Sequence, residues 1–176
     1  MGARVAQPVS MPILFAVFCC AVFAADKLSE LQTRFDSEPN SVHKARMIEK
    51  LGDAEFAEAG REEKAGNYAV ADLIFEKYRD NVRSACTALE KDSPDAERHP
   101  NGYKQLEMHV QKGLREIDEI MLIVPPEFKP PLQLVRKDLL SLDDELLRCL
   151  FPRKHENKPA PAPPPQADPA VPGVRP

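Results

Sequence analysis

Two cysteines are the most reactive side chains in the body of this 176-residue chain. Cys86 and Cys149 stand far apart in the sequence, and Cys19 and Cys20 fall in an apolar stretch near the N-terminus. Two cysteines in an exported protein often pair. We expect Cys86 near the end of the third helix and Cys149 near the end of the fifth. If the third, fourth and fifth helices run up, down and up, both cysteines lie near one end of a bundle, where a disulfide would close a loop of about 60 residues. The alternative is two buried free thiols that pack as small apolar side chains.

The four histidines do not have the spacing of metal ligands. They are His43, His99, His109 and His155. None belongs to a His-Glu-x-x-His motif, and none has a Glu three residues before it, as a di-iron bundle requires. His43 and His109 could approach each other in a bundle, but solvent-facing histidine is the ordinary explanation. The sequence therefore predicts no metal site and no cofactor.

Carboxylates that could act as acid or base catalysts are grouped at three places. These are Glu62-Glu63, Asp143-Asp144-Glu145, and Glu116 with Glu119. All stand among other charges on helix faces that we expect to be solvated, whereas catalysis needs a carboxylate with a shifted pKa in a cleft. The sequence also has no Gly-rich phosphate loop and no Gly-x-Ser-x-Gly motif. We therefore expect a protein that is not an enzyme.

The N-terminus predicts an export signal over residues 1–24. Arg4 is the only charged residue before Asp26, and residues 11–23 form an apolar run interrupted by one proline. Small residues occupy the two positions that a signal peptidase inspects, so we expect cleavage after Ala24 and a periplasmic or secreted protein. The alternative is an uncleaved membrane anchor, although the run is shorter than the roughly 20 apolar residues of a spanning helix.

The C-terminal residues 152–176 predict a disordered tail. They hold nine of the eighteen prolines and no aromatic residue, so they have almost nothing to bury. Such a segment favours extended, partly polyproline II conformations. It is either a spacer or docking peptide, or a tail without a partner.

Between these ends, residues 25–151 form one domain that is long enough to bury a core. The whole chain carries a net charge of −4, and its charges are interspersed. Nucleic-acid binding is disfavoured because it needs clustered lysine and arginine. The absence of tryptophan and the 6% aromatic content also argue against a carbohydrate cleft or a base-stacking platform.

Apolar residues recur in this domain at steps of three and four, which predicts helices and no strands. We expect a single antiparallel all-α bundle of about five helices. Asn40 or Ser41 begins the second helix, the third begins near Asn67, and the residue before Pro125 ends the fourth. The expected buried stripes are Leu28, Leu31 and Phe35; Val42, Ala45, Ile48, Gly52, Phe56 and Ala59; Ala71, Phe75, Tyr78, Val82, Ala85 and Leu89; Tyr103, Leu106, Val110, Gly113 or Leu114, Ile117, Met121 and Val124; and Val135, Leu139, Leu142, Leu146 and Cys149 or Leu150.

The corner between the second and third helices has a recurring pattern. Gly66-Asn67-Tyr68 is followed by Ala71 and Phe75, and Ala59 stands seven residues before the glycine. With these residues, the segment 50–80 resembles the helical hairpin of a tetratricopeptide repeat, which implies a protein-binding role. A repeat array stacks several copies, and no second copy appears here.

This segment also departs from the repeat pattern. Glu55, Glu58 and Glu62 stand where the family has Trp, Leu and Tyr, and Tyr78 stands where it usually has Ala. The plain alternative is a left-handed glycine that ends one helix and a Tyr68 that packs over the joint.

The loop VPPEFKPPL, residues 124–132, is the most distinctive expected surface feature. Its four prolines stiffen it, and Phe128 stands in the middle. Either Phe128 inserts into a partner, or it folds back on the core of a simple helix connection. Phe128 and Tyr68 are therefore the candidate partner contacts.

Three function classes follow from these observations. The first is an exported, non-enzymatic adaptor or scaffold that contacts other envelope or secreted proteins, with a membrane involved only through an uncleaved signal peptide. The alternative is a small periplasmic chaperone or stress sensor, although Leu28-Ser29-Glu30-Leu31-Gln32 does not match the Leu-Thr-x-x-Gln signature of known helical chaperones of that kind. The third is a hydrolase, which a pocket lined by converging carboxylates would favour.

Overall fold

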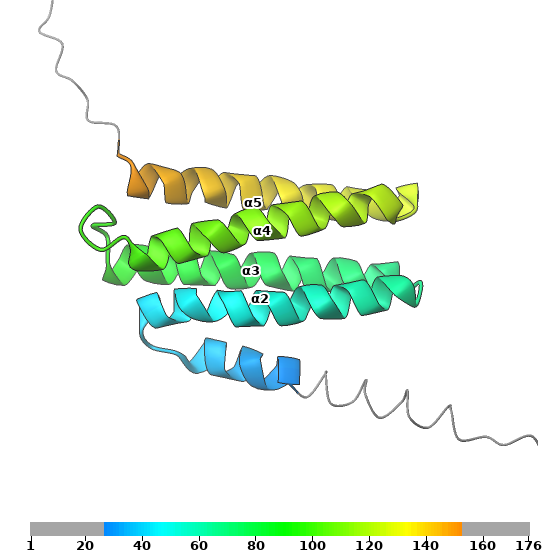
Figure 1. Ribbon diagram of the computed structural model, residues 1–176, viewed down its shortest axis with the longest axis horizontal. Helices are drawn as coiled ribbons and strands as arrows, with labels where there is room; N and C mark the ends of the chain where they lie inside the picture. Colours follow the sequence, from blue (N-terminus) through cyan, green and yellow to red (C-terminus); the bar gives the residue numbers. More distant parts are fainter. Residues whose placement is uncertain (1–26, 153–176) are drawn as a thin grey trace, which may run out of the picture.

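The computed structural model describes residues 27–152, and every regular element in this range is helical. The expected signal peptide (1–24) and all but the first residue of the expected tail (152–176) lie outside the described residues. A short helix over residues 27–37 precedes four long helices and a 3-10 turn (Figure 1). The all-α class is therefore confirmed for this range. The elements are α2 (Ser41–Lys64), α3 (Tyr68–Asp92), α4 (Asn101–Ile123), η1 (Pro126–Phe128) and α5 (Lys129–Leu150).

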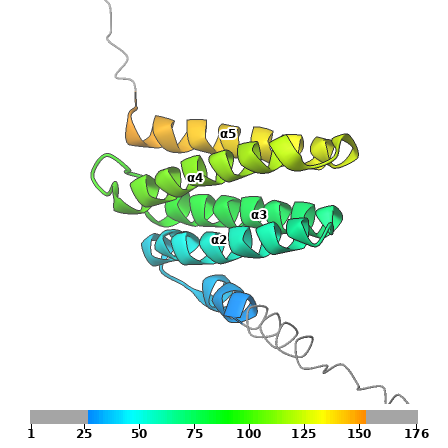
Figure 2. The ribbon, with the colours of Figure 1, turned by 45° about the vertical axis from the view of Figure 1, so that its right-hand side comes forward.

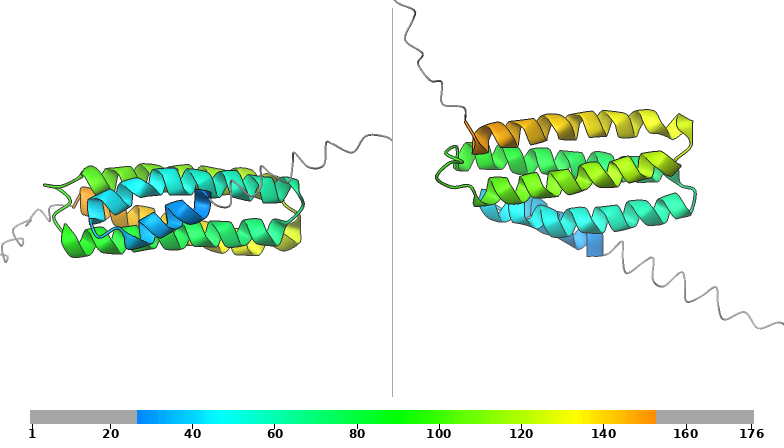
Figure 3. Two further views of the ribbon diagram at one scale, coloured as in Figure 1. Left: turned by 90° about the horizontal axis from the view of Figure 1, so that it is seen from below. Right: turned by 45° about the horizontal axis from the view of Figure 1, so that its top comes forward.

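The four long helices surround one core. Helix α2 packs against α3 and α4, and α5 packs against α4 and α3 (Figure 1). Figure 2 shows the short helix 27–37 on the α2 side of the bundle, away from α5. In the left view of Figure 3 it lies over the seam between α2 and α3. The bundle therefore has a fifth helix on one face only.

Helix α2 begins at the predicted cap. The Asn40 side chain accepts a hydrogen bond from the backbone N–H of His43 at 2.8 Å. This bond satisfies one of the N–H groups that have no partner within the helix. Just before it, Phe35 is buried, and the Lys44 ammonium lies 4.6 Å from the Phe35 ring centroid. The turn at residues 38–40 thus sends the chain from the short helix back along α2.

The corner between α2 and α3 follows the glycine prediction. Gly66 has φ +79°, the left-handed region in which only glycine is free of strain. Its N–H donates to Glu63 O at 2.8 Å, and the N–H of Asn67 donates to Glu62 O at 2.8 Å. This pair of bonds is the Schellman motif, which satisfies carbonyls at the end of a helix. The resemblance to a tetratricopeptide repeat remains a prediction, because a single corner of this kind also occurs outside repeats.

Most of the predicted stripe residues form the core. All six positions predicted on α3 are buried, as are the predicted residues of α5, where Leu150 is buried and Cys149 half-buried. Four predicted residues are half-buried at the edge: Leu28, Leu31, Val42 and Met121. Gly113 and Leu114 are both buried. Periodicity therefore located the buried faces well.

Helix α5 begins earlier than expected. The sequence predicts a loop over residues 124–132, but the helix starts within it at Lys129 and holds Pro130 and Pro131 in its first turn. Proline fits there because the first N–H groups of a helix lack partners in any case. Val124, in extended conformation, ends α4 as predicted.

Two glycines let three helices approach closely around one ring. A Cβ on Gly52 of α2 would lie 2.9 Å from Tyr78 Cε2, and a Cβ on Gly113 of α4 would lie 2.5 Å from Tyr78 Cε1. The Tyr78 ring of α3 is therefore packed between glycine backbone on both sides.

Within residues 27–152, no helix is both long and apolar enough to cross a membrane.

Candidate functional site

Tyr68 and Phe128, the candidate partner contacts, lie against each other. Their ring centroids are 5.3 Å apart, and both residues are half-buried against the core. Phe128 thus folds back toward the bundle at the end where α3 begins. A role of these two rings in partner binding remains a prediction.

The two cysteines of the bundle are both free thiols in the structure. Cys86 is buried on α3, and Cys149 is half-buried on α5. The disulfide predicted as one of two alternatives remains a prediction.

Among the described residues, His43 and His109 do not meet. His43, near the start of α2, pairs with the Glu38 carboxylate at 2.5 Å. His109 lies in the middle of α4 and is buried, so the expectation of a solvent-facing histidine is wrong for this residue. Its neighbours on α2 and α3 supply polar partners, which is the reason it can be buried.

The Tyr78–His109 cluster consists of Tyr78, His109, Asp53 and Lys112. The Tyr78 hydroxyl lies 2.9 Å from His109 Nδ1 and 2.9 Å from the His109 carbonyl oxygen. Asp53 Oδ1 lies 3.2 Å from His109 Nε2 and accepts from Lys112 Nζ at 2.7 Å. The carboxylate favours the tautomer with the proton on Nε2, so Nδ1 accepts from the tyrosine. The Tyr78 hydroxyl and both ring nitrogens of His109 therefore have partners.

The surroundings of His109 and Asp53 also determine their protonation states. Burial lowers the pKa of His109, against the opposing effect of Asp53. Burial acts to raise the pKa of Asp53, but the hydrogen bonds from Lys112 and His109 outweigh it and lower the pKa. A neutral His109 beside an ionised Asp53 is thus the stable state at neutral pH. The cluster fits a structural role in joining α2, α3 and α4.

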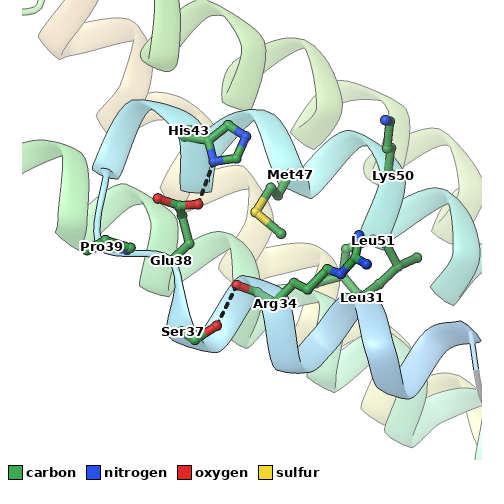
Figure 4. Close-up of a pocket in the computed structure, with 9 residues that line it drawn as sticks. All are labelled: Leu31, Arg34, Ser37, Glu38, Pro39, His43, Met47, Lys50 and Leu51. Carbon is green, nitrogen blue, oxygen red and sulfur yellow. Dashed lines mark hydrogen bonds and ion pairs between the residues drawn. The ribbon is translucent and has the colours of Figure 1, made fainter.

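Two grooves flank the helix over residues 27–37. Figure 4 shows the first, where Met47 points from α2 toward the short helix and Lys50 extends away from it. Its polar groups are largely engaged, since Glu38 pairs with His43 and the Ser37 hydroxyl donates to the Arg34 carbonyl oxygen at 3.2 Å. This groove offers few free groups to a ligand.

The second groove, on the opposite side of the short helix, has different chemistry. We name it the Glu55 groove, and its volume is about 400 Å³. Leu73 of α3 is 62% exposed in its wall, and Val70 is 43% exposed. Much of the wall is therefore apolar and open to solvent. The groove is lined by Leu28, Ser29, Gln32, Glu55, Glu58, Val70, Leu73, Ile74 and Lys77.

Glu55 forms the floor of this groove and is only 2% exposed. Its Oε1 accepts from Asn81 Nδ2 at 2.8 Å. The amides of Asn81 and Gln32 in turn exchange hydrogen bonds of 2.9 and 3.1 Å, which attach the short helix to α3. The other oxygen, Glu55 Oε2, is buried and has no hydrogen-bond partner within the described residues.

Burial determines the charge of Glu55. It raises the pKa to about 8, although the Asn81 hydrogen bond and the Lys77 charge act in the opposite direction. At neutral pH the carboxyl is therefore mostly protonated, and its O–H is a donor without an acceptor. An unmet buried donor costs about 1–3 kcal/mol, and a ligand that accepts the bond recovers part of this. The groove is thus suited to an apolar group that carries a hydrogen-bond acceptor.

Sequence reasoning missed Glu55 as a functional candidate. It stands four residues after the buried Leu51 and four before the buried Ala59, so its position on the buried face was visible. The signal was overlooked because Glu55 was read only as a departure from the repeat pattern. The carboxylate groups that were considered, such as Glu62-Glu63, do not contribute to the groove.

Comparison with known proteins gives no relative for this chain. No family model, no curated protein and no solved structure matches it. The Glu55 groove is therefore the feature from which a function can be proposed.

Proposed function

We propose that this chain is an exported, non-enzymatic helical protein that works as an adaptor or scaffold, and that the Glu55 groove holds a segment of a partner protein. The observation that carries the proposal is the unpartnered, buried Glu55 Oε2 beneath an apolar wall that stays open to solvent. The apolar patch that the exposed Val70 and Leu73 form beside such a group fits a surface that another molecule covers.

The chemistry of the groove defines the partner segment. Leu73, Val70 and Leu28 offer apolar contact, and the protonated Glu55 offers one hydrogen bond. An apolar peptide segment with a free carbonyl oxygen, such as the last turn of a helix, satisfies both. Lys77 at the rim suits the partial negative charge at a helix C-terminus.

A partner capture from envelope extract tests this proposal. The full chain and the variant Leu73→Asp are used as baits, with Leu122→Asp as a matched control, because Leu122 is 82% exposed on α4 and lies outside the groove. We expect Leu73→Asp to lose specific partners that Leu122→Asp retains. Equal partner sets from all three baits would refute the role of the groove.

A second pair of variants tests the polar contact. In Glu55→Gln the amide can still donate a hydrogen bond, whereas Glu55→Met fills similar space without a donor. With a partner identified, we expect Glu55→Gln to retain binding and Glu55→Met to weaken it by roughly tenfold, which corresponds to about 1.4 kcal/mol. Deletion of residues 152–176 in the same assay shows whether the tail contributes.

The chaperone alternative is favoured by a separate observation. Several large apolar side chains outside the groove are exposed on α4 and α5 or just after α5, and a surface of this kind can hold unfolded chains. Suppression of aggregation of a denatured client at near-equal amounts would support the chaperone, and no suppression would support the adaptor. The exposed residues are Met108, Leu122, Ile123, Leu134, Leu140, Leu147 and Phe151.

A further inference from the structure

Helices α3 and α5 bring four potential metal ligands to one end of the bundle. Cys86 and Glu90 stand one turn apart on α3, and Glu145 and Cys149 stand one turn apart on α5. Figure 1 shows that α3 and α5 run in the same direction, so that their C-terminal ends lie at the same end of the molecule. The cluster is distinct from the Glu55 groove.

The distances within this cluster fit a small cation. One ligand atom each of Cys86, Glu90 and Glu145 lies within 4.8 Å of the other two. The Cys86 Sγ lies 3.9 Å from Glu90 Oε1. Zinc–sulfur and zinc–oxygen bonds of about 2.3 and 2.0 Å place neighbouring tetrahedral ligands about 3.5 Å apart. Side-chain rotation alone can therefore close the cluster around an ion.

The cluster has negative groups without a balancing cation. Within residues 27–152, no basic side chain forms an ion pair with Glu90 or Glu145. A divalent cation would replace the proton of each thiol that binds it, these protons pass to solvent, and its charge would offset two of the negative charges of the ligands.

Solvent can reach this place. Cys86 is 2% exposed, but Glu90 and Glu145 are exposed on the outer side of the seam between α3 and α5. Cys149 lines a surface hollow together with Pro94 and Arg148. The arrangement thus has one ligand anchored in the core and others free to close on an ion from outside.

We propose that Cys86, Glu90 and Glu145 bind a thiophilic divalent cation, with Cys149 as the fourth ligand. Thiolate with carboxylate ligands in a four-coordinate site favours zinc over magnesium or calcium, which prefer oxygen ligands alone. No histidine motif in the sequence marks this site, because it contains no histidine. The same two cysteines also form the candidate disulfide, so metal binding and the disulfide exclude each other.

Cobalt titration of the reduced full chain, freed of metal with a chelator, tests the proposal. Cobalt bound to a thiolate gives a sulfur-to-metal charge-transfer band. We expect this band to appear with one equivalent of Co²⁺ and to disappear when Zn²⁺ is added. Circular dichroism of each variant checks that the bundle remains folded.

Four variants assign the ligands. The double variant Cys86→Ser/Cys149→Ser should abolish the charge-transfer band, and Glu90→Gln, at an exposed position, should lower Zn²⁺ affinity by at least the roughly 10–100-fold seen for losses around metal ligands. Cys149→Ser should weaken binding while a charge-transfer band remains. The control Glu119→Gln, an exposed glutamate of α4, should leave the affinity unchanged.

Three results would overturn the proposal. The first is the absence of a charge-transfer band in the reduced wild-type chain. The second is a band that persists in the double variant, which would place the thiolate elsewhere. The third is an affinity that Glu90→Gln leaves unchanged, and unchanged affinity in Cys149→Ser would remove Cys149 from the ligand set.

Discussion

The Tyr78–His109 cluster and Glu55 are two buried polar regions that share α2 and α3 but differ in completeness. In the first, each polar side-chain atom of Tyr78 and His109 has a partner. In the second, Asn81 satisfies one oxygen of Glu55, and the other has no partner among residues 27–152. A complete network stabilises one arrangement of helices, whereas an incomplete one has capacity left for a ligand. The difference separates a structural centre from a candidate site.

Substitution of a glycine that packs against the Tyr78 ring should have the largest effect on the free energy of unfolding. In Gly113→Ala, the new Cβ would lie 2.8 Å from Tyr78 Oη and displace the ring from His109. We expect the free energy of unfolding to fall by about 3 kcal/mol, from overpacking and a weakened hydrogen bond. Urea unfolding measures it.

Gly60→Ala is the matched control in α2. No atom lies within 4 Å of a Cβ placed there, so we expect this variant to gain about 0.5–1 kcal/mol from helix propensity. If Gly113→Ala were as stable as Gly60→Ala, the close packing of glycine against Tyr78 would not hold the helices together.

Glu55→Gln tests the incomplete region through the pH dependence of the free energy of unfolding. Because the pKa of Glu55 is raised in the folded protein, only the unfolded chain releases the Glu55 proton between about pH 4.5 and pH 8. The unsubstituted protein therefore loses stability as the pH rises through this window. The variant lacks this loss. At pH 8 we expect it to exceed the parent by about 2 kcal/mol, less than the shift alone implies because its amide also lacks one partner.

Unfolding of both proteins at pH 4 and at pH 8 measures the effect. At pH 4 the carboxyl is protonated in both states, so the advantage of the variant should disappear. A difference that is equal at the two pH values would contradict the assignment of a buried, protonated Glu55.

Tyr78→Phe removes the central hydroxyl of the complete cluster and leaves His109 Nδ1 without its partner. We expect a loss of about 1.5 kcal/mol in the free energy of unfolding. Tyr68→Phe is the control, because the Tyr68 hydroxyl forms no hydrogen bond within the described residues. Equal stabilities of the two variants would show that the buried contact with His109 contributes nothing.

Asp53→Asn should have the smallest effect on stability. Asp53 is 48% exposed, so its contacts with His109 and Lys112 are screened and the loss should be about 0.5 kcal/mol. The substitution should have a clearer effect on the pKa of His109. Because the Asp53 charge raises this pKa, His109 should titrate at lower pH in the variant. NMR titration of His109 measures this, and an unchanged pKa would remove Asp53 from the cluster.

The sequence predicted the helices because burial on a helix recurs at a fixed period. The stripe from Ala71 to Leu89 and the stop at Val124 both depend on local properties of the chain. The early start of α5 was missed because two prolines were read as a break, although a first helical turn accepts them. These are questions of local geometry, and one sequence suffices for most of them.

The candidate site was harder to predict because its partners come from different helices. Glu55 is buried at low cost only where Asn81 of α3 faces it, and His109 only where Tyr78 does. The spacing from Cys86 to Glu90 was visible in the sequence, but its meeting with α5 depends on which helices are neighbours. Polar burial therefore follows tertiary register, which periodicity does not encode.

The close packing of Gly52 and Gly113 against Tyr78 makes the two parts of the bundle differ in how they tolerate substitution. Positions 52 and 113 admit only a residue without a side chain, so the mutual spacing of α2, α3 and α4 is fixed by atoms that cannot rearrange. Helix α5 contains no glycine and packs through aliphatic side chains. Exchanges among Leu, Ile and Met can be absorbed there by new rotamers. Redesign of this scaffold therefore has most freedom along α5.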